Sequence, residues 1–112
     1  MSQITTHILD TTQGRPADGV HVILYQEQLK NWIEIARGTT NSDGRVASLL
    51  KKDVVLEPGI YKLKFETQAY FAQLAVQTFY PYVEIVFDIT SNEHYHVPLL
   101  ISPYGYSTYR GS

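Results

Sequence analysis

Apolar and polar residues alternate along several short stretches of this chain, and this period of two is typical of β-strands with one buried face. The clearest stretch is residues 60–66, where Tyr61, Leu63 and Phe65 alternate with charged residues. Further strands are predicted at residues 4–10, 20–26, 32–36, 83–89, 94–101 and 104–110. The chain is therefore expected to consist mainly of short strands.

Turn-forming residues separate these strands and leave room for one helix. Residues 41–44 (NSDG) and 57–59 (EPG) are rich in residues that tolerate turn geometry. Residues 67–74 are the helix candidate, because apolar residues recur four apart, and Thr67 is expected to cap its start. Roughly seven or eight strands with turns every 8–12 residues favour an all-β sandwich, formed as a single domain over residues 1–112.

The amino-acid composition excludes several kinds of site and disfavours several kinds of partner. The chain has 112 residues, no cysteine and a net charge of −2. The lack of cysteine excludes a disulfide framework, a thiolate zinc site and a cysteine nucleophile, and the charge does not favour nucleic acid as a partner. No stretch approaches the ~20 apolar residues of a membrane span. The first residues lack the basic start and apolar run of a secretion signal, so a cytoplasmic protein is expected.

Four histidines dominate the remaining reactive side chains. His94 and His96 stand two apart on a predicted strand, so both point to the same face. A purely structural role in the strand stays open for each histidine. A metal site is the alternative, because neutral imidazole is the commonest metal ligand. Its third ligand would be His7 or His21, and no spacing rule selects between them.

Motifs near both ends of the chain resemble those of a known family. They are residues 7–10 (HILD), 14–17 (GRPA), 43–45 (DGR), 94–103 (HYHVPLLISP) and 106–112 (YSTYRGS). Together they resemble the transthyretin-related proteins, and the final Tyr-Arg-Gly-Ser resembles the ending of the 5-hydroxyisourate hydrolases among them. The thyroid-hormone carriers of the same fold lack this ending. The resemblance spans essentially the whole chain.

The resemblance implies a transthyretin-like β-sandwich of two four-stranded sheets with one short helix. It implies a homotetramer, arranged as a dimer of dimers, with sites in clefts at the dimer–dimer interface. The implied reaction is hydrolysis of 5-hydroxyisourate to 2-oxo-4-hydroxy-4-carboxy-5-ureidoimidazoline in urate degradation. The implied enzyme uses no metal and no organic cofactor.

The same resemblance assigns the site residues. The implied catalytic residues are His7, Arg45 and His96. The implied substrate contacts are His7, Arg45, Tyr109, Arg110, Gly111 and Ser112. Hydrolysis of a cyclic amide suits this set, because a neutral imidazole can take a proton from water and a guanidinium can stabilise an oxyanion. His7 and His96 are 89 positions apart in the sequence, so only the fold can bring them together, and the sequence does not say which is the base.

Two other functions compete with this interpretation. A transthyretin-type carrier would bind a small aromatic ligand without turning it over, and a structural β-sandwich would neither bind nor react. The two histidines, Arg45 and the final tetrapeptide favour the enzyme.

Overall fold

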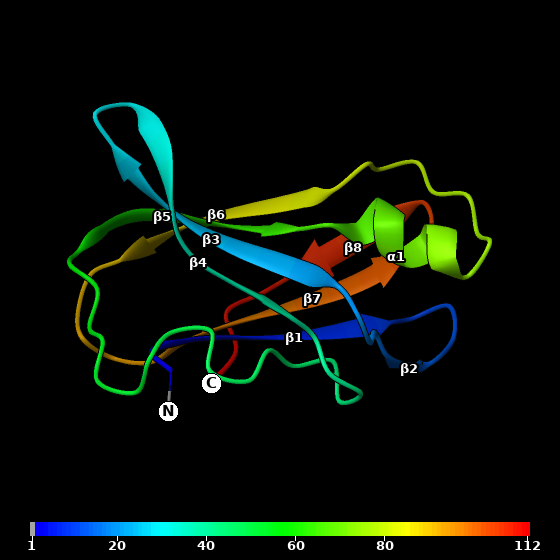
Figure 1. The fold of residues 1–112 in the computed structure, drawn as a ribbon, viewed down its shortest axis with the longest axis horizontal. Helices are drawn as coiled ribbons and strands as arrows, with labels where there is room; N and C mark the ends of the chain where they lie inside the picture. The colour runs from blue at the N-terminus through cyan, green and yellow to red at the C-terminus, as the bar shows by residue number, and fades with distance from the viewer. Residues whose placement is uncertain (1) are drawn as a thin grey trace.

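Two four-stranded β-sheets face one another, as Figure 1 shows. The computed structural model describes residues 2–112. One sheet has the strand order β2-β1-β7-β8 and the other has the order β4-β3-β5-β6. The elements are β1 (Ile4–Asp10), β2 (Arg15–Pro16), β3 (His21–Gln28), β4 (Asn31–Thr39), β5 (Gly59–Phe65), α1 (Thr67–Gln73), β6 (Val83–Ile89), β7 (Tyr95–Ser102) and β8 (Gly105–Thr108). The predicted all-β sandwich of two four-stranded sheets with one short helix is confirmed.

The hydrophobic core lies between the two sheets, where alternate side chains of each strand point inward. In β5, Tyr61, Leu63 and Phe65 have no exposed surface, as the alternation in the sequence predicts. The opposite sheet contributes Ile8 and Leu99, which are also fully buried. Burial of each such side chain contributes roughly 1.5–3 kcal/mol relative to exposure. The buried residues of both sheets form one hydrophobic cluster.

β1 and β7 run parallel although they come from opposite ends of the chain. Ile4 pairs with Tyr95, and the pairing continues without interruption to Asp10 opposite Ile101. The other strand pairs of the described region are antiparallel. The central pair of this sheet therefore joins the first strand to the seventh and brings together side chains that are distant in the sequence.

Helix α1 follows β5 and is anchored to β1. The buried hydroxyl of Tyr70 donates a 2.8 Å hydrogen bond to the carboxylate of Asp10, which has no exposed surface. The other Asp10 oxygen accepts the backbone N–H groups of Thr12 and Gln13 at 3.0 and 3.2 Å. A helix of seven residues depends on such hydrogen bonds for its stability.

Residues 2–112 contain no helix that is long and apolar enough to cross a membrane.

Several predicted elements differ from the structure in detail. The prediction that Thr67 caps the helix was wrong, because Glu66 is the N-cap residue, no side chain caps the first turn, and Thr67 lies inside the helix. β2 forms where a loop was expected, since Leu9 of β1 pairs with Pro16. β4 is also longer than its predicted core of residues 32–36.

Candidate active site

His7 lies on the outer face of the β2-β1-β7-β8 sheet. β1 turns Ile4, Thr6 and Ile8 toward the core, whereas Thr5 and His7 point the other way and are half-buried. Successive side chains of a strand point to opposite faces, so the same alternation that builds the core places this imidazole outside it. His7 is therefore accessible from outside the sandwich.

β7 places His96 beside His7 on the same face. In the parallel ladder Thr5 lies opposite His96, and His7 lies opposite Pro98. His7 and His96 are therefore diagonal neighbours, and side chains in that relation are typically about 7–8 Å apart at their Cα atoms. The pairing of β1 with β7 therefore brings together two histidines that are 89 positions apart in the sequence.

The turn before Arg45 places this residue against β1, beside His7. The side-chain oxygen of Asn41 accepts the N–H groups of Asp43 and Arg45 at 2.9 and 3.2 Å. Gly44 has a positive φ of 74° and a backbone oxygen 2.8 Å from the N–H of Ile8. A Cβ at Gly44 would lie 3.3 Å from the His7 ring, so glycine permits this close approach.

Arg45 therefore joins β1 directly. It forms an isolated antiparallel bridge with His7, and bridged residues point to the same face of a sheet. The Arg45 side chain is exposed. The three residues expected to be catalytic, His7, Arg45 and His96, thus come from a strand, a turn and a second strand and share one face.

The C-terminal segment packs against His96 from the other side. Gly111 forms an isolated bridge with His96, and its N–H donates a 2.9 Å hydrogen bond to the His96 carbonyl oxygen. A Cβ at Gly111 would lie 2.5 Å from Cδ2 of the His96 ring, so only glycine fits here without movement. This contact limits how far the His96 ring can rotate.

The same segment explains why the last strand is shorter than predicted. Gly111 pairs with His96 in the register that joins Thr108 to Leu99. Pro98 lies between the two paired stretches and has no N–H to donate, so the ladder is interrupted there. The predicted strand at residues 104–110 is therefore observed as β8 and a separate bridge. Figure 1 shows this red segment running back along β7 after β8.

Two of the four tail residues have a described contact with a histidine: Gly111 lies against the His96 ring, and Arg110 donates to the His94 carbonyl oxygen at 3.5 Å. The Arg110 guanidinium lies 2.5 Å from the Glu93 carboxylate and 4.5 Å from the centroid of the Tyr95 ring. Tyr109 is 61% exposed, and Ser112 is also exposed. Gly111 is the tail residue in contact with His96. Contacts of Tyr109, Arg110 and Ser112 with a substrate stay predictions.

Burial and neighbouring positive charge set the electrostatics of the site. Desolvation lowers the pKa of His96 below its ordinary value of 6.5, and the charges of Arg45, His94 and His7 lower this pKa further. His96 is therefore a neutral imidazole at neutral pH, which is the form that can accept a proton. The influence of Arg45 and His7 on this pKa also reflects their proximity to His96.

Two residues beside the site, Thr5 and His94, were not assigned a catalytic or substrate-binding role from the sequence, where His94 was only a candidate metal ligand. The Thr5 hydroxyl oxygen lies 2.7 Å from Nε2 of His94 and 2.8 Å from Nδ1 of His96. The two imidazole rings are stacked, with centroids 6.3 Å apart. Their common strand face was visible in the sequence, but the position of Thr5 opposite His96 depends on the register of β1 against β7.

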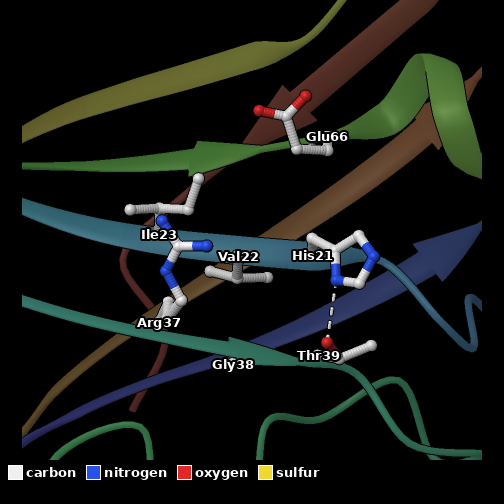
Figure 2. Close-up of a pocket in the computed structure, with 7 residues that line it drawn as sticks. All are labelled: His21, Val22, Ile23, Arg37, Gly38, Thr39 and Glu66. Atoms are coloured by element: carbon white, nitrogen blue, oxygen red, sulfur yellow. Dashed lines mark hydrogen bonds between the residues drawn. The ribbon is translucent and has the colours of Figure 1, made fainter.

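The remaining histidine lies elsewhere. A cavity of about 280 Å³ lies on the other sheet. Figure 2 shows the residues that line it, among them His21, Arg37 and Glu66. His21 is hydrogen-bonded to Thr39, and Arg37 is paired with Glu34. His21 therefore does not join His94 and His96 as a third metal ligand. Among residues 2–112, no group of three or more histidine or acidic residues is arranged to hold a metal ion.

Known proteins match this chain over nearly its whole length. Residues 4–111 match the model of the HIUase/Transthyretin family. The chain is 46% identical to 5-hydroxyisourate hydrolase of Mus musculus, and the match covers 99% of this chain and 96% of the mouse protein.

Two solved structures have the same fold. The structure of Klebsiella pneumoniae 5-hydroxyisourate hydrolase is 40% identical with a TM-score of 0.86, covering 97% of this chain and 98% of the other. Sea bream transthyretin, solved in complex with thyroxine, gives a TM-score of 0.91 at 30% identity, covering 97% and 94%. Over nearly its whole length, this chain belongs to the HIUase/Transthyretin family.

Proposed function

We propose that this protein is a 5-hydroxyisourate hydrolase, which opens the six-membered ring of its substrate with water. The observation that carries the proposal is the meeting of His7, Arg45 and His96 on one sheet face. The identity of 46% to the mouse hydrolase, against 30% to sea bream transthyretin, also supports an enzyme over a carrier.

The proposed chemistry uses His96 as the general base. Its neutral imidazole takes a proton from water, and the resulting hydroxide attacks the carbonyl carbon of the cyclic amide. The Arg45 guanidinium stabilises the oxyanion of the tetrahedral intermediate. The C–N bond then breaks, the ring nitrogen receives the proton, and 2-oxo-4-hydroxy-4-carboxy-5-ureidoimidazoline is formed. No bond change in this sequence requires an oxidant or reductant.

His7 and the C-terminal segment have supporting roles in this proposal. His7 lies two residue pairs along the ladder from His96, on the same face, and it bridges Arg45, which suits it to bind the substrate or to orient the water. Gly111 holds the tail against His96, and we assign Tyr109, Arg110 and Ser112 to the wall of the site. In this assignment Arg110 exchanges its exposed contact with Glu93 for an anionic substrate.

We further propose that the active form is a homotetramer, a dimer of dimers. The site residues lie on an open sheet face, so a second chain is needed to wall the cleft. Exposed aromatic residues lie in and beside the edge strand β8: Tyr106 within it is 44% exposed, and Tyr104 and Tyr109 on either side are 68% and 61% exposed. Aromatic side chains of this kind are enriched at protein interfaces.

The decisive experiment follows the ultraviolet absorbance of 5-hydroxyisourate freshly generated from urate. The protein is expected to accelerate its disappearance well beyond the spontaneous decay measured in buffer alone. A rate equal to that of the control would refute the proposal. Binding of the substrate or of a hydroxylated aromatic without any acceleration would instead support the carrier.

The cytoplasmic location expected from the sequence stays a prediction. Fractionation of cells that express the protein at its natural level tests it. Recovery outside the cytoplasmic fraction would contradict it.

A further inference from the structure

One hydroxyl group connects two imidazole rings beside the candidate active site. Thr5 Oγ1 lies 2.7 Å from His94 Nε2 and 2.8 Å from His96 Nδ1. A threonine hydroxyl carries one proton to donate and accepts through its lone pairs. Thr5 can therefore donate to at most one of the two rings, so at least one ring must donate its N–H to the threonine oxygen. Where the hydroxyl donates to one ring and accepts from the other, the two histidines hold complementary tautomers.

We propose that Thr5 and His94 are positioning residues that set the tautomer of His96. In this arrangement the Thr5 hydroxyl donates to Nε2 of His94 and accepts the Nδ1–H of His96. Nε2 of His96 then carries a lone pair and serves as the base. The inference rests on the proposed function for its catalytic consequence, but the tautomer itself can be observed without substrate.

The surroundings of the two rings favour this direction. His96 is half-buried and close to the permanent positive charge of Arg45, and a cation favours a lone pair over an N–H on the ring nitrogen left free. His94 is exposed, so water can satisfy its Nδ1 in either tautomer. The buried ring therefore imposes the tautomer, and the exposed ring adapts to it.

The arrangement also stabilises the charge that forms during the reaction. When Nε2 of His96 takes a proton from water, the ring becomes an imidazolium with a proton on each nitrogen. Its Nδ1–H keeps donating to Thr5, and the Thr5 proton remains directed at His94. No proton leaves the relay, so the proton on Nε2 remains available for the leaving nitrogen. The backbone of Gly111 holds the ring in place meanwhile.

Thr5→Val tests the role because valine keeps the shape of threonine and removes the hydroxyl. We expect kcat to fall between about 10-fold and 100-fold, the range expected for one hydrogen bond to a charged group, with KM nearly unchanged. Thr5→Ser restores the hydroxyl and is expected to recover most of kcat. His94→Phe keeps a flat ring against His96 but removes the acceptor, so it should resemble Thr5→Val.

The fold provides a matched control on the opposite sheet. Nδ1 of His21 lies 2.8 Å from the hydroxyl of Thr39, the hydrogen bond drawn in Figure 2. Thr39→Val removes the same kind of contact from a histidine outside the proposed site. This variant is expected to keep the kcat and KM of the unchanged protein.

Nitrogen-15 NMR of labelled histidine rings measures the tautomer directly, at a pH above the pKa of His96. We expect the unchanged protein to hold its His96 proton on Nδ1, and Thr5→Val to give a mixture of tautomers. A His96 proton on Nε2 in the unchanged protein, or the same tautomer in Thr5→Val, would overturn the inference. Full kcat in folded Thr5→Val would overturn it as well.

The two readouts separate this inference from the proposed function. If the unchanged protein fails to accelerate decay of 5-hydroxyisourate, the proposed function fails while the NMR result still decides the tautomer. If the protein is an active hydrolase and the tautomer does not respond to Thr5, only the inference about Thr5 and His94 fails.

Discussion

Individual residues of the candidate site owe their properties to immediate neighbours. His96 has Thr5 on one ring nitrogen, the backbone of Gly111 against Cδ2, and the charges of Arg45 and His7 nearby. Each feature has a separate effect: the hydroxyl orients the ring, the glycine limits its rotation, and burial together with the nearby charges lowers the pKa of His96 and keeps the ring neutral. Three predictions belong to this scale.

Replacing either catalytic histidine should remove most of the activity. His96→Asn and His7→Asn are each expected to lose roughly 10²-fold to 10⁴-fold in kcat, because general base catalysis by His96 typically contributes that much and depends on the water or substrate that His7 positions. Both side chains lie outside the core, so the fold and the assembly should persist. Steady-state kinetics with circular dichroism measure both quantities. Near-full turnover in both variants would contradict the assigned roles.

The pH dependence of kcat/KM should report the neutral form of His96. A base works only when unprotonated, so activity falls as pH drops through its pKa. Burial and the nearby positive charges lower this pKa, which places the acid limb below the ordinary histidine value of 6.5. Initial rates between pH 5 and 8 check this. A limb centred above 6.5, or a flat profile, would point to another base.

Arg45→Lys should impair the reaction even though it keeps the charge. Lysine presents a compact ammonium where the guanidinium offers a planar set of donors, so oxyanion stabilisation is lost in part. We expect a fall in kcat of at least about tenfold, the effect of one lost donor of this kind being as large as 10²-fold or more. Equal activity of this variant would remove Arg45 from the chemistry.

Pairing between elements is what assembles the site. The parallel register of β1 and β7 puts Thr5 opposite His96, and the turn at residues 41–45 joins β1 through Arg45. A shift of one residue in this register would send His7 or His96 to the other face of the sheet. The contact between Asp10 and Tyr70 holds the end of β1 to helix α1 and helps to keep its position.

Tyr70→Phe tests that anchor. The substitution leaves one oxygen of the fully buried Asp10 carboxylate without its hydrogen bond, so we expect a loss of about 1–3 kcal/mol in the free energy of unfolding. Urea denaturation measures it. Tyr82→Phe is the control, because Tyr82 is 43% exposed and a phenyl ring keeps its contact with Lys64. Equal stability of the two variants would exclude the anchor.

The whole molecule presents an open site and an aromatic edge, which is why an assembly is proposed. A sandwich of this size has its interior filled by one core cluster, leaving a substrate cleft to form between chains. The fold matches both a 5-hydroxyisourate hydrolase and a transthyretin solved in complex with thyroxine, with TM-scores of 0.86 and 0.91, so the fold alone does not determine the function.

Tyr104→Asp should break the assembly and the activity together. Tyr104 is 68% exposed in the single chain, and a charge there would be buried against the partner in the proposed tetramer. Sedimentation is expected to show smaller species, with turnover reduced in proportion. Leu29→Asp serves as control, since Leu29 is 95% exposed at the β3–β4 turn. An intact, fully active Tyr104→Asp tetramer would contradict the proposed interface.

Most strands and several candidate site residues could be predicted, because they depend on residues that are close together in the sequence. Alternation of apolar residues identified the strands and their buried faces, and the terminal motifs indicated the family and the candidate residues His7, Arg45 and His96. Local patterns predicted the structure less well where contacts with other elements decide it. This was the case at β2, at the first turn of α1, and just after the end of β8, beside Pro98.

Tertiary structure alone decided which of these residues meet. The sequence by itself determined that His7 and His96 stand on strand faces. The register of β1 against β7 decided that these two residues are neighbours, and that Thr5 lies between His94 and His96. The reason is physical: a residue's secondary structure depends on its sequence neighbours, whereas its contacts across a sheet depend on hydrogen bonds to strands that are distant in the chain.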